Sequence, residues 1–278
     1  MSGGKENHMN HHHDNVLLPL AEYEILFVLA FVLSLVAYSS AALVSSRRRK
    51  PWPLFRIVCW GIGTFCAMVA IIGPLAHRAH GDFVTHMWSH WLLAMLAPLL
   101  MAMAKPVALL LQMVPTHWAQ HLFLLLKSWP LRFLRHPATA VLLHTGGLWI
   151  VYTTPFYAAM YENTALYLFV HLHMFLAGYL FTAVILAIEP MPNRPSFTLR
   201  VAALITASAA HAVLAKYIYA HPPKTIPVEQ AKAGAMVMYY SGDVIDISLM
   251  IILFAQWYRA NRPRALPFAA DAAKREFF

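Results

Sequence analysis

Charge is scarce in this sequence: only 12% of its 278 residues are Asp, Glu, Lys or Arg, whereas 60% are hydrophobic. Ordinary soluble domains carry about 25% charged residues, so a surface of this composition would not stay in water. The scarcity excludes a soluble enzyme, a nucleic-acid-binding module and a disordered chain for the bulk of the sequence. We expect an all-α, polytopic membrane protein, because open strands would leave backbone groups unpaired in lipid.

Cysteine is scarce as well. Cys59 and Cys66 lie seven residues apart in one apolar run, which is about 10 Å along a helix and too far for a mutual disulfide. The absence of a Cys-x-x-Cys motif argues against thiol–disulfide exchange and against a thiolate metal site. We interpret both residues as small buried hydrophobic side chains.

Long apolar runs are what the sequence does contain. Each of seven runs is long enough to cross the hydrocarbon core, which takes about 17–25 residues. They are residues 22–44, 54–73, 84–104, 138–154, 162–188, 198–220 and 233–258. We predict a single membrane domain over residues 1–278: a polar, His-rich tail at 1–21, a bundle of about seven helices at 22–258 and a basic tail at 259–278. Residues 106–130, divided by Pro115, are expected to form an amphipathic segment at the cytoplasmic membrane surface.

The few basic residues predict the orientation. The first apolar run is followed by four of them in the segment 47–50, and the positive-inside rule places such a turn in the cytoplasm. With that turn inside, the inner segments together carry more Lys and Arg than the outer loops together. We therefore predict a multi-pass protein of the cell (inner) membrane with its N-terminus outside and its C-terminus in the cytoplasm.

Histidines gather in the outer half of this predicted bundle. At about 1.5 Å of rise per residue, most of them lie roughly 9–16 Å below the outer ends of their helices. The polar residues of this layer are His86, His90, His144, His171, His173, His211 and Asp243. Ionisable side chains inside a bilayer are costly and by default mark a site. Because imidazole is the commonest protein ligand for copper, zinc and iron, the layer predicts a metal site that opens to the outer side.

The paired histidines have two interpretations each. His86 and His90 share a helix face at a spacing of four, which suits chelation or capping at the headgroup level. His171 and His173 lie about 200° apart around a helix. We therefore expect one of them to bind the ion while the other supports it or serves a second site.

The remaining polar residues have plainer interpretations. His144 is interpreted as a hydrogen-bonded packing group, and Asp243 as a partner of an imidazolium or a proton relay. His77 and His80 fall in an outer loop and are expected to be solvated. The histidines of the tail at 1–21 either gather metal loosely or form part of a polar tail without a role.

Four blocks, in order, resemble the seven-helix CtaG family of cytochrome c oxidase assembly factors. Residues 85–111 contain His-Met-x-x-His followed by Ala-Pro-Leu-Leu, and residues 169–195 contain His-x-His, Gly-Tyr-Leu-Phe and an acidic-Pro-x-Pro exit. Residues 209–219 and 241–265 resemble the last two spans, with a single His, a Gly-Asp and a Gln-Trp. The first two predicted helices are only compatible with the family pattern. Glu189 follows the fifth predicted helix, at a position where we expect Asp from that pattern.

The resemblance implies a non-enzymatic role in building a haem-copper oxidase, by binding or delivering copper. The partners it implies are the catalytic subunit of cytochrome c oxidase or other respiratory-complex subunits, within the lipid bilayer and without nucleic acid. Carried over by motif, the metal-binding residues are His86, His90, His171, His173, His211 and Asp243. His144 is not part of the family pattern.

Other functions stay open from the sequence. The bundle could carry copper or protons, although its inner half offers few polar groups to continue a path. It could be a membrane haem protein, with imidazoles such as His171 and His211 as axial ligands. It could also be an accessory structural subunit of a respiratory complex, in which the histidine layer is a packed polar network.

Overall fold

The structure is a computed structural model that describes residues 4–48 and 51–262, with the backbone only at residues 4–23 and 48. Every regular element within these ranges is a helix. The prediction of an all-α polytopic fold is therefore confirmed. Six stretches of helix are long and apolar enough to cross a membrane: Glu24–Arg47, Leu54–Ile71, Phe83–Met113, Thr164–Leu186, Phe197–Ala220 and Val228–Asn261.

The first, second and last three of these stretches are single helices. They are α1 (Gly4–Arg48), α2 (Leu54–Ile71), α12 (Thr164–Leu186), α13 (Phe197–Ala220) and α14 (Val228–Asn261). The backbone of the predicted tail at 1–21 belongs largely to α1, which begins at Gly4. Of the basic tail at 259–278, the residues from 263 onward lie outside the described residues.

The third and fourth predicted runs are rods interrupted by π-helices. The third consists of α4 (Phe83–Trp91), η1 (Leu92–Leu96) and α5 (Ala97–Ala104). The fourth consists of α9 (Pro137–Val141), η2 (Leu142–Gly146) and α10 (Gly147–Thr153). The fourth rod is not among the six long stretches. Single π turns inside α-helices are frequent at functional sites.

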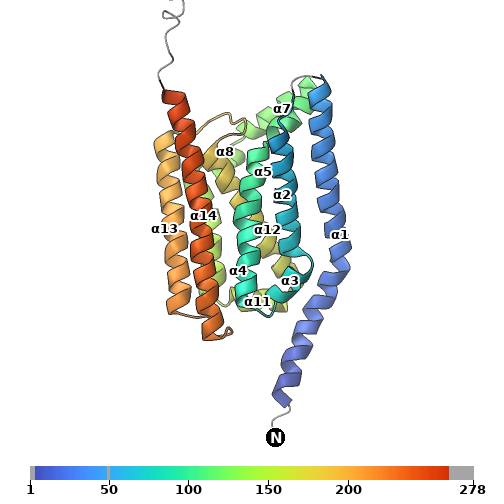
Figure 1. Ribbon diagram of the computed structural model, residues 1–278, viewed down its shortest axis with the longest axis vertical. Coiled ribbons are helices and arrows are strands. Elements are labelled where there is room, and N and C mark those ends of the chain that lie inside the picture. The colour runs from blue at the N-terminus through green and yellow to red at the C-terminus, as the bar shows by residue number, and fades with distance from the viewer. Residues whose placement is uncertain (1–3, 49–50, 263–278) are drawn as a thin grey trace, which may run out of the picture.

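The two ends of the bundle carry different short helices. One end holds α3 (Pro74–Ala79) and α11 (Phe156–Glu162), whereas α6 (Pro106–Met113), α7 (Thr116–Lys127) and α8 (Trp129–Leu134) lie at the other end (Figure 1). The sequence divides at Pro115 as expected, and α7 buries none of its residues. The position of this segment at a membrane surface and the orientation of the bundle remain predictions.

Basic residues gather at the end that holds α7. The C-terminal ends of α1 and α14 lie at the same end of the bundle as α7 and α8 (Figure 1). Basic side chains on or beside these ends are Arg47, Lys127, Arg132, Arg135, Arg194 and Arg259. This segregation is what the positive-inside rule requires of a cytoplasmic end.

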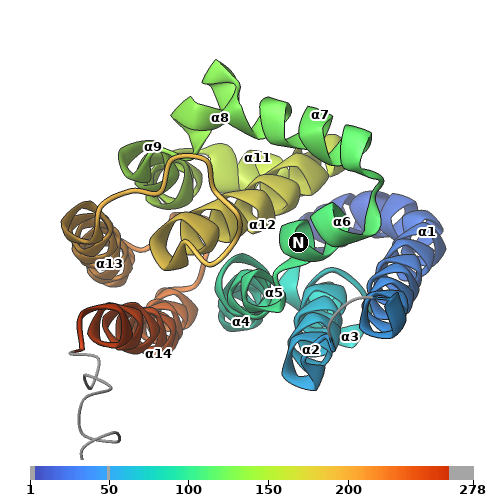
Figure 2. The same ribbon diagram turned by 90° about the horizontal axis from the view of Figure 1, so that it is seen from above.

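Helix α12 lies in the middle of the bundle, with the third rod on one side and α9 on the other (Figure 2). Its closest approach to the third rod is at Gly178, where an added Cβ would overlap the carbonyl oxygen of Ala94 in η1. Only glycine leaves room for two backbones to pack at this distance. Small residues play the same role in many membrane helix pairs, where van der Waals packing drives association.

We expect Gly178→Ala to lower the free energy of unfolding by about 1–3 kcal/mol, because α12 and η1 must separate to admit the methyl group. The measurement is thermal unfolding of the purified protein in detergent. Gly61→Ala is the matched control, since a Cβ there would lie 3.8 Å from Leu35 Cδ1, an ordinary contact. Equal midpoints for the two variants would contradict the assigned role of Gly178.

Candidate metal centre

Helix α4 places two imidazoles inside the bundle. Its N-cap is Asp82, whose side chain accepts a hydrogen bond from the backbone N–H of Thr85 at 3.0 Å, and this cap determines where the first turn begins. His86 and His90 follow on one face and are only 2% and 3% exposed. The two rings therefore point away from lipid, one helical turn apart.

His86 faces His171 of α12, with ring centroids 6.3 Å apart. Its Nε2 lies 2.9 Å from the Tyr152 hydroxyl and its Nδ1 lies 3.1 Å from the Tyr161 hydroxyl. The Tyr161 hydroxyl donates to the Ala79 carbonyl oxygen at 3.2 Å. Because the Tyr161 proton is used in that bond, the Tyr161 oxygen can only accept a hydrogen bond from His86. The Nδ1–H tautomer of His86 therefore fits both contacts: Nδ1–H donates to Tyr161, and Nε2 accepts from Tyr152.

His171 is held in one tautomer by its own helix. Its Nδ1 lies 2.8 Å from the backbone carbonyl oxygen of Tyr167, and because a carbonyl only accepts, Nδ1 must carry the proton. The lone pair of His171 is then on Nε2. Metal-binding histidines commonly show this arrangement, in which the second ring nitrogen donates to a carbonyl.

His90 faces His211 of α13, with ring centroids 6.4 Å apart and an angle of 27° between the ring planes. His211 is 4% exposed and occupies space left by Gly242 of α14, where a Cβ would lie 2.5 Å from His211 Cε1. Both ring nitrogens of His90 and Nε2 of His211 are buried and have no hydrogen-bond partner among the described residues. A buried polar atom left unpaired costs about 1–3 kcal/mol, so this pair needs an explanation.

The other predicted residues lie outside these two pairs. His173 is half-buried on another face of α12, where its Nε2–H donates to the Leu143 carbonyl oxygen of η2 at 3.2 Å. His144 stacks on Phe181 with ring centroids 4.7 Å apart, in keeping with its interpretation as a packing group. Asp243 is half-buried on α14, next to Gly242.

Four of the predicted metal-binding histidines lie in two separate pairs. Within the part of the chain that the structure describes, no set of three or more His, Cys, Asp or Glu side chains is placed to hold one metal ion. The six predicted ligands therefore do not meet at one point. The structure brings together His86 with His171 and His90 with His211, and it separates His173 and Asp243 from them.

The expectation that His77 and His80 are solvated is wrong for His80. Its ring is half-buried and stacks on Tyr167 with centroids 4.9 Å apart, and its Nδ1–H donates to the Ala76 carbonyl oxygen at 2.8 Å. The loop in which it was expected folds into α3, and this helix packs His80 against α12. His77 is exposed, with Nε2 at 2.9 Å from a Glu24 carboxylate oxygen. The side chains of the histidine-rich tail at 1–21 lie outside the described residues.

A tyrosine cluster that was not predicted from the sequence covers the His86 pair. The rings of Tyr152, Tyr157, Tyr161 and Tyr167 follow one another with centroid separations of 5.8, 5.2 and 6.3 Å. A signal was present, because Tyr157 and Tyr161 are spaced four residues apart, which places them on one face of a helix. That helix is α11, which begins between the predicted runs 138–154 and 162–188.

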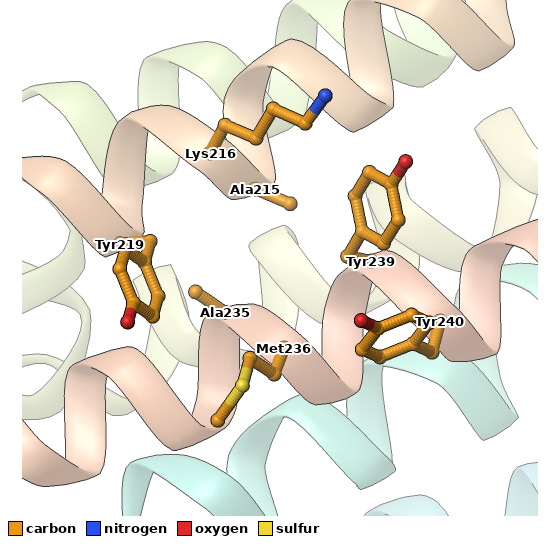
Figure 3. A pocket seen from close by; sticks show the side chains of 7 residues that line it. All are labelled: Ala215, Lys216, Tyr219, Ala235, Met236, Tyr239 and Tyr240. Carbon is orange, nitrogen blue, oxygen red and sulfur yellow. The ribbon is translucent and has the colours of Figure 1, made fainter.

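Two pockets lie beside the pairs. An apolar pocket of about 390 Å³ between α1, α2 and α12 reaches His171 and is lined by Phe27, Phe31, Leu93 and Phe175 among others. The second, of about 290 Å³, lies between α13 and α14 and is lined by Lys216, Tyr219, Tyr239 and Tyr240 with Met236 and two alanines (Figure 3). Lys216 Nζ lies 5.3 Å from the centre of the Tyr239 ring. Neither pocket is lined by His90 or His211.

A family described as the cytochrome c oxidase caa3 assembly factor, Caa3_CtaG, matches residues 36–260. The chain belongs to this family. The matched region runs from α1 to α14 and contains both histidine pairs. The resemblance read from the four sequence blocks is therefore confirmed.

The curated relatives of this family member are longer proteins without an assigned function. Uncharacterized proteins of Mycobacterium bovis and Mycobacterium tuberculosis are each 30% identical over 205 residues, which cover 70% of this chain and 31% of theirs. An uncharacterized protein of Mycobacterium leprae is 29% identical over 253 residues, covering 81% of this chain and 38% of its own. The chain thus spans about a third of the length of these relatives. No solved structure matches it.

We expect Tyr152→Phe in this assembly-factor family member to lower the free energy of unfolding by about 1–3 kcal/mol, because His86 Nε2 would lose its partner in a buried position. Thermal unfolding in detergent measures the effect. Tyr240→Phe is the control, since the Tyr240 side chain is exposed and its hydroxyl can bond to solvent or lipid headgroups. An unchanged midpoint for Tyr152→Phe would show that this contact does not stabilise the fold.

Proposed function

We propose that the chain is a non-enzymatic factor that helps to assemble a haem-copper cytochrome c oxidase in the cell membrane, and that it binds copper as cargo between His90 and His211. Family membership supports the assembly role. One observation carries the copper proposal: two buried imidazoles from different helices face each other with unpaired ring nitrogens. A bound ion would satisfy these nitrogens, and imidazole is a suitable ligand for copper.

The two pairs suggest how cargo moves. His86 and His90 are on successive turns of α4, so the His86–His171 pair lies about 6 Å nearer the end that holds α3 and α11. His171 presents a lone pair on Nε2 there, beside an apolar pocket. We propose that copper enters through His171 and passes to His90 and His211 by ligand exchange. Sites with two protein ligands suit such exchange because they leave positions open for the next ligand.

The geometry disfavours the haem alternative. A haem between His171 and His211 would need both rings to face a common space. His171 instead faces His86, and His211 faces His90, and among the described residues no ring contact joins His171 to His211. The observations favour small-ion binding over a macrocycle.

We expect full-length protein loaded with Cu(I) and dialysed to retain copper, and His90→Ala and His211→Ala to retain about tenfold less, because each removes one of two ligands. Elemental analysis gives the stoichiometry. All proteins in the comparison carry serine in place of the histidines at positions 8 and 11–13, so that the tail does not contribute. His221→Ala is the control, because His221 is exposed and follows the last residue of the helix that carries His211. Equal copper in all four proteins would contradict the assignment to this pair.

The assembly role is tested separately in cells. In a host strain lacking the chain, we expect haem-copper oxidase activity and its haem absorbance to fall, and the original sequence to restore them. His90→Ala should fail to restore activity, whereas His221→Ala should restore it. Full oxidase activity without the chain would refute the assembly role, while normal rescue by His90→Ala would refute only the copper pair.

A further inference from the structure

A polar pocket of about 500 Å³ lies at the opposite end of the bundle from the histidine pairs. It is formed by the start of α2, the junction of α5 and α6 and the segment after α12. Its polar lining residues include Trp52, Arg56, Lys105, Gln112, Glu189 and Arg194. This pocket shares no residue with the candidate metal centre.

The pocket carries an excess of positive charge. Three basic side chains face its one carboxylate, Glu189. The Glu189 oxygens also accept hydrogen bonds from the backbone N–H groups of Val107 and Ala108 at 3.1 and 3.0 Å. Burial raises the pKa of Glu189, against the attraction of Lys105 and Arg56. Among the described residues, none of the three basic side chains of the pocket forms an ion pair.

The basic groups are held before any ligand arrives. The Arg56 guanidinium carbon lies 4.5 Å from the centre of the Trp52 ring, and its Nε is buried without a hydrogen-bond partner in the described chain. The Trp52 ring is itself fixed, because its Nε1–H donates to the Tyr38 hydroxyl at 3.1 Å. Lys105 has φ 57°, a left-handed conformation that costs a non-glycine residue energy and often marks a functional position.

We propose that this pocket binds the phosphate group of an anionic phospholipid. Guanidinium groups recognise phosphate through paired hydrogen bonds, and basic pockets between membrane helices at the cytoplasmic side bind anionic lipid headgroups. A lipid fits better than a soluble anion because exposed apolar side chains flank the pocket on the same elements. Leu54 and Phe55 of α2 are 72% and 53% exposed, and Leu110 of α6 is 49% exposed. Acyl chains can lie along these side chains while the headgroup occupies the pocket.

The experiment is native mass spectrometry of the full chain in detergent with phosphatidylglycerol added, and with phosphatidylcholine as the neutral lipid. We expect one phosphatidylglycerol to bind more tightly than phosphatidylcholine. Arg56→Gln and Arg194→Gln should each weaken that binding about tenfold, through loss of a charge-assisted contact. Arg259→Gln, at an exposed residue of the same end that does not line the pocket, should bind as the original chain does.

Three results would overturn the proposal. They are equal binding of the two lipids, unchanged phosphatidylglycerol binding in both variants, and displacement of the lipid by millimolar inorganic phosphate, which would identify a site for free phosphate. Arg194 is exposed, so Arg194→Gln gives an answer even if Arg56→Gln fails to fold. The outcome does not depend on copper, because neither arginine lies near the histidine pairs.

Discussion

The close contact between α12 and η1 is the constraint on which the rest of the bundle depends. Gly178 lets the two backbones touch at Ala94, and this contact fixes the separation of the helices that carry His86 and His171. The Asp82 cap fixes the residue at which α4 begins, and therefore the register of His86 along that helix. Because both the distance and the register are set by backbone packing, the packing of the backbone itself brings the imidazoles together in the interior.

The two histidine pairs differ in how their buried nitrogens are satisfied. Tyrosine hydroxyls complete the hydrogen bonds of His86, so burying this ring costs little. Among the described residues, neither ring nitrogen of His90 has a hydrogen-bond partner. Stability alone would therefore favour an apolar residue at this position. Proteins tend to bury unpaired polar groups at functional sites, where function outweighs stability. Selection for stability therefore does not account for His90, and we propose a transient ligand as the reason for it.

Much of the fold could be predicted from the sequence because hydropathy and length determine which segments can span a bilayer. The depth of each histidine in the bilayer, calculated from helical rise, stays a prediction. Which rings face one another could not be predicted, since this depends on the rotation of each helix about its axis. That rotation is set by contacts such as Gly242 against His211, which join residues far apart in the chain. Helix α3 was missed because it is too short to show periodicity, and with it the burial of His80.

The glycines that shape the bundle also shape the spaces for its histidines. A Cβ at position 147 would lie 2.5 Å from His173 Nε2, as one at Gly242 would from His211 Cε1. Each ring therefore occupies a place where the facing helix has no side chain, and helix packing and ligand placement cannot be separated. A substitution that widened these contacts would move the imidazoles as well as loosen the fold. The positions of the imidazoles thus depend on the residues that leave room for them.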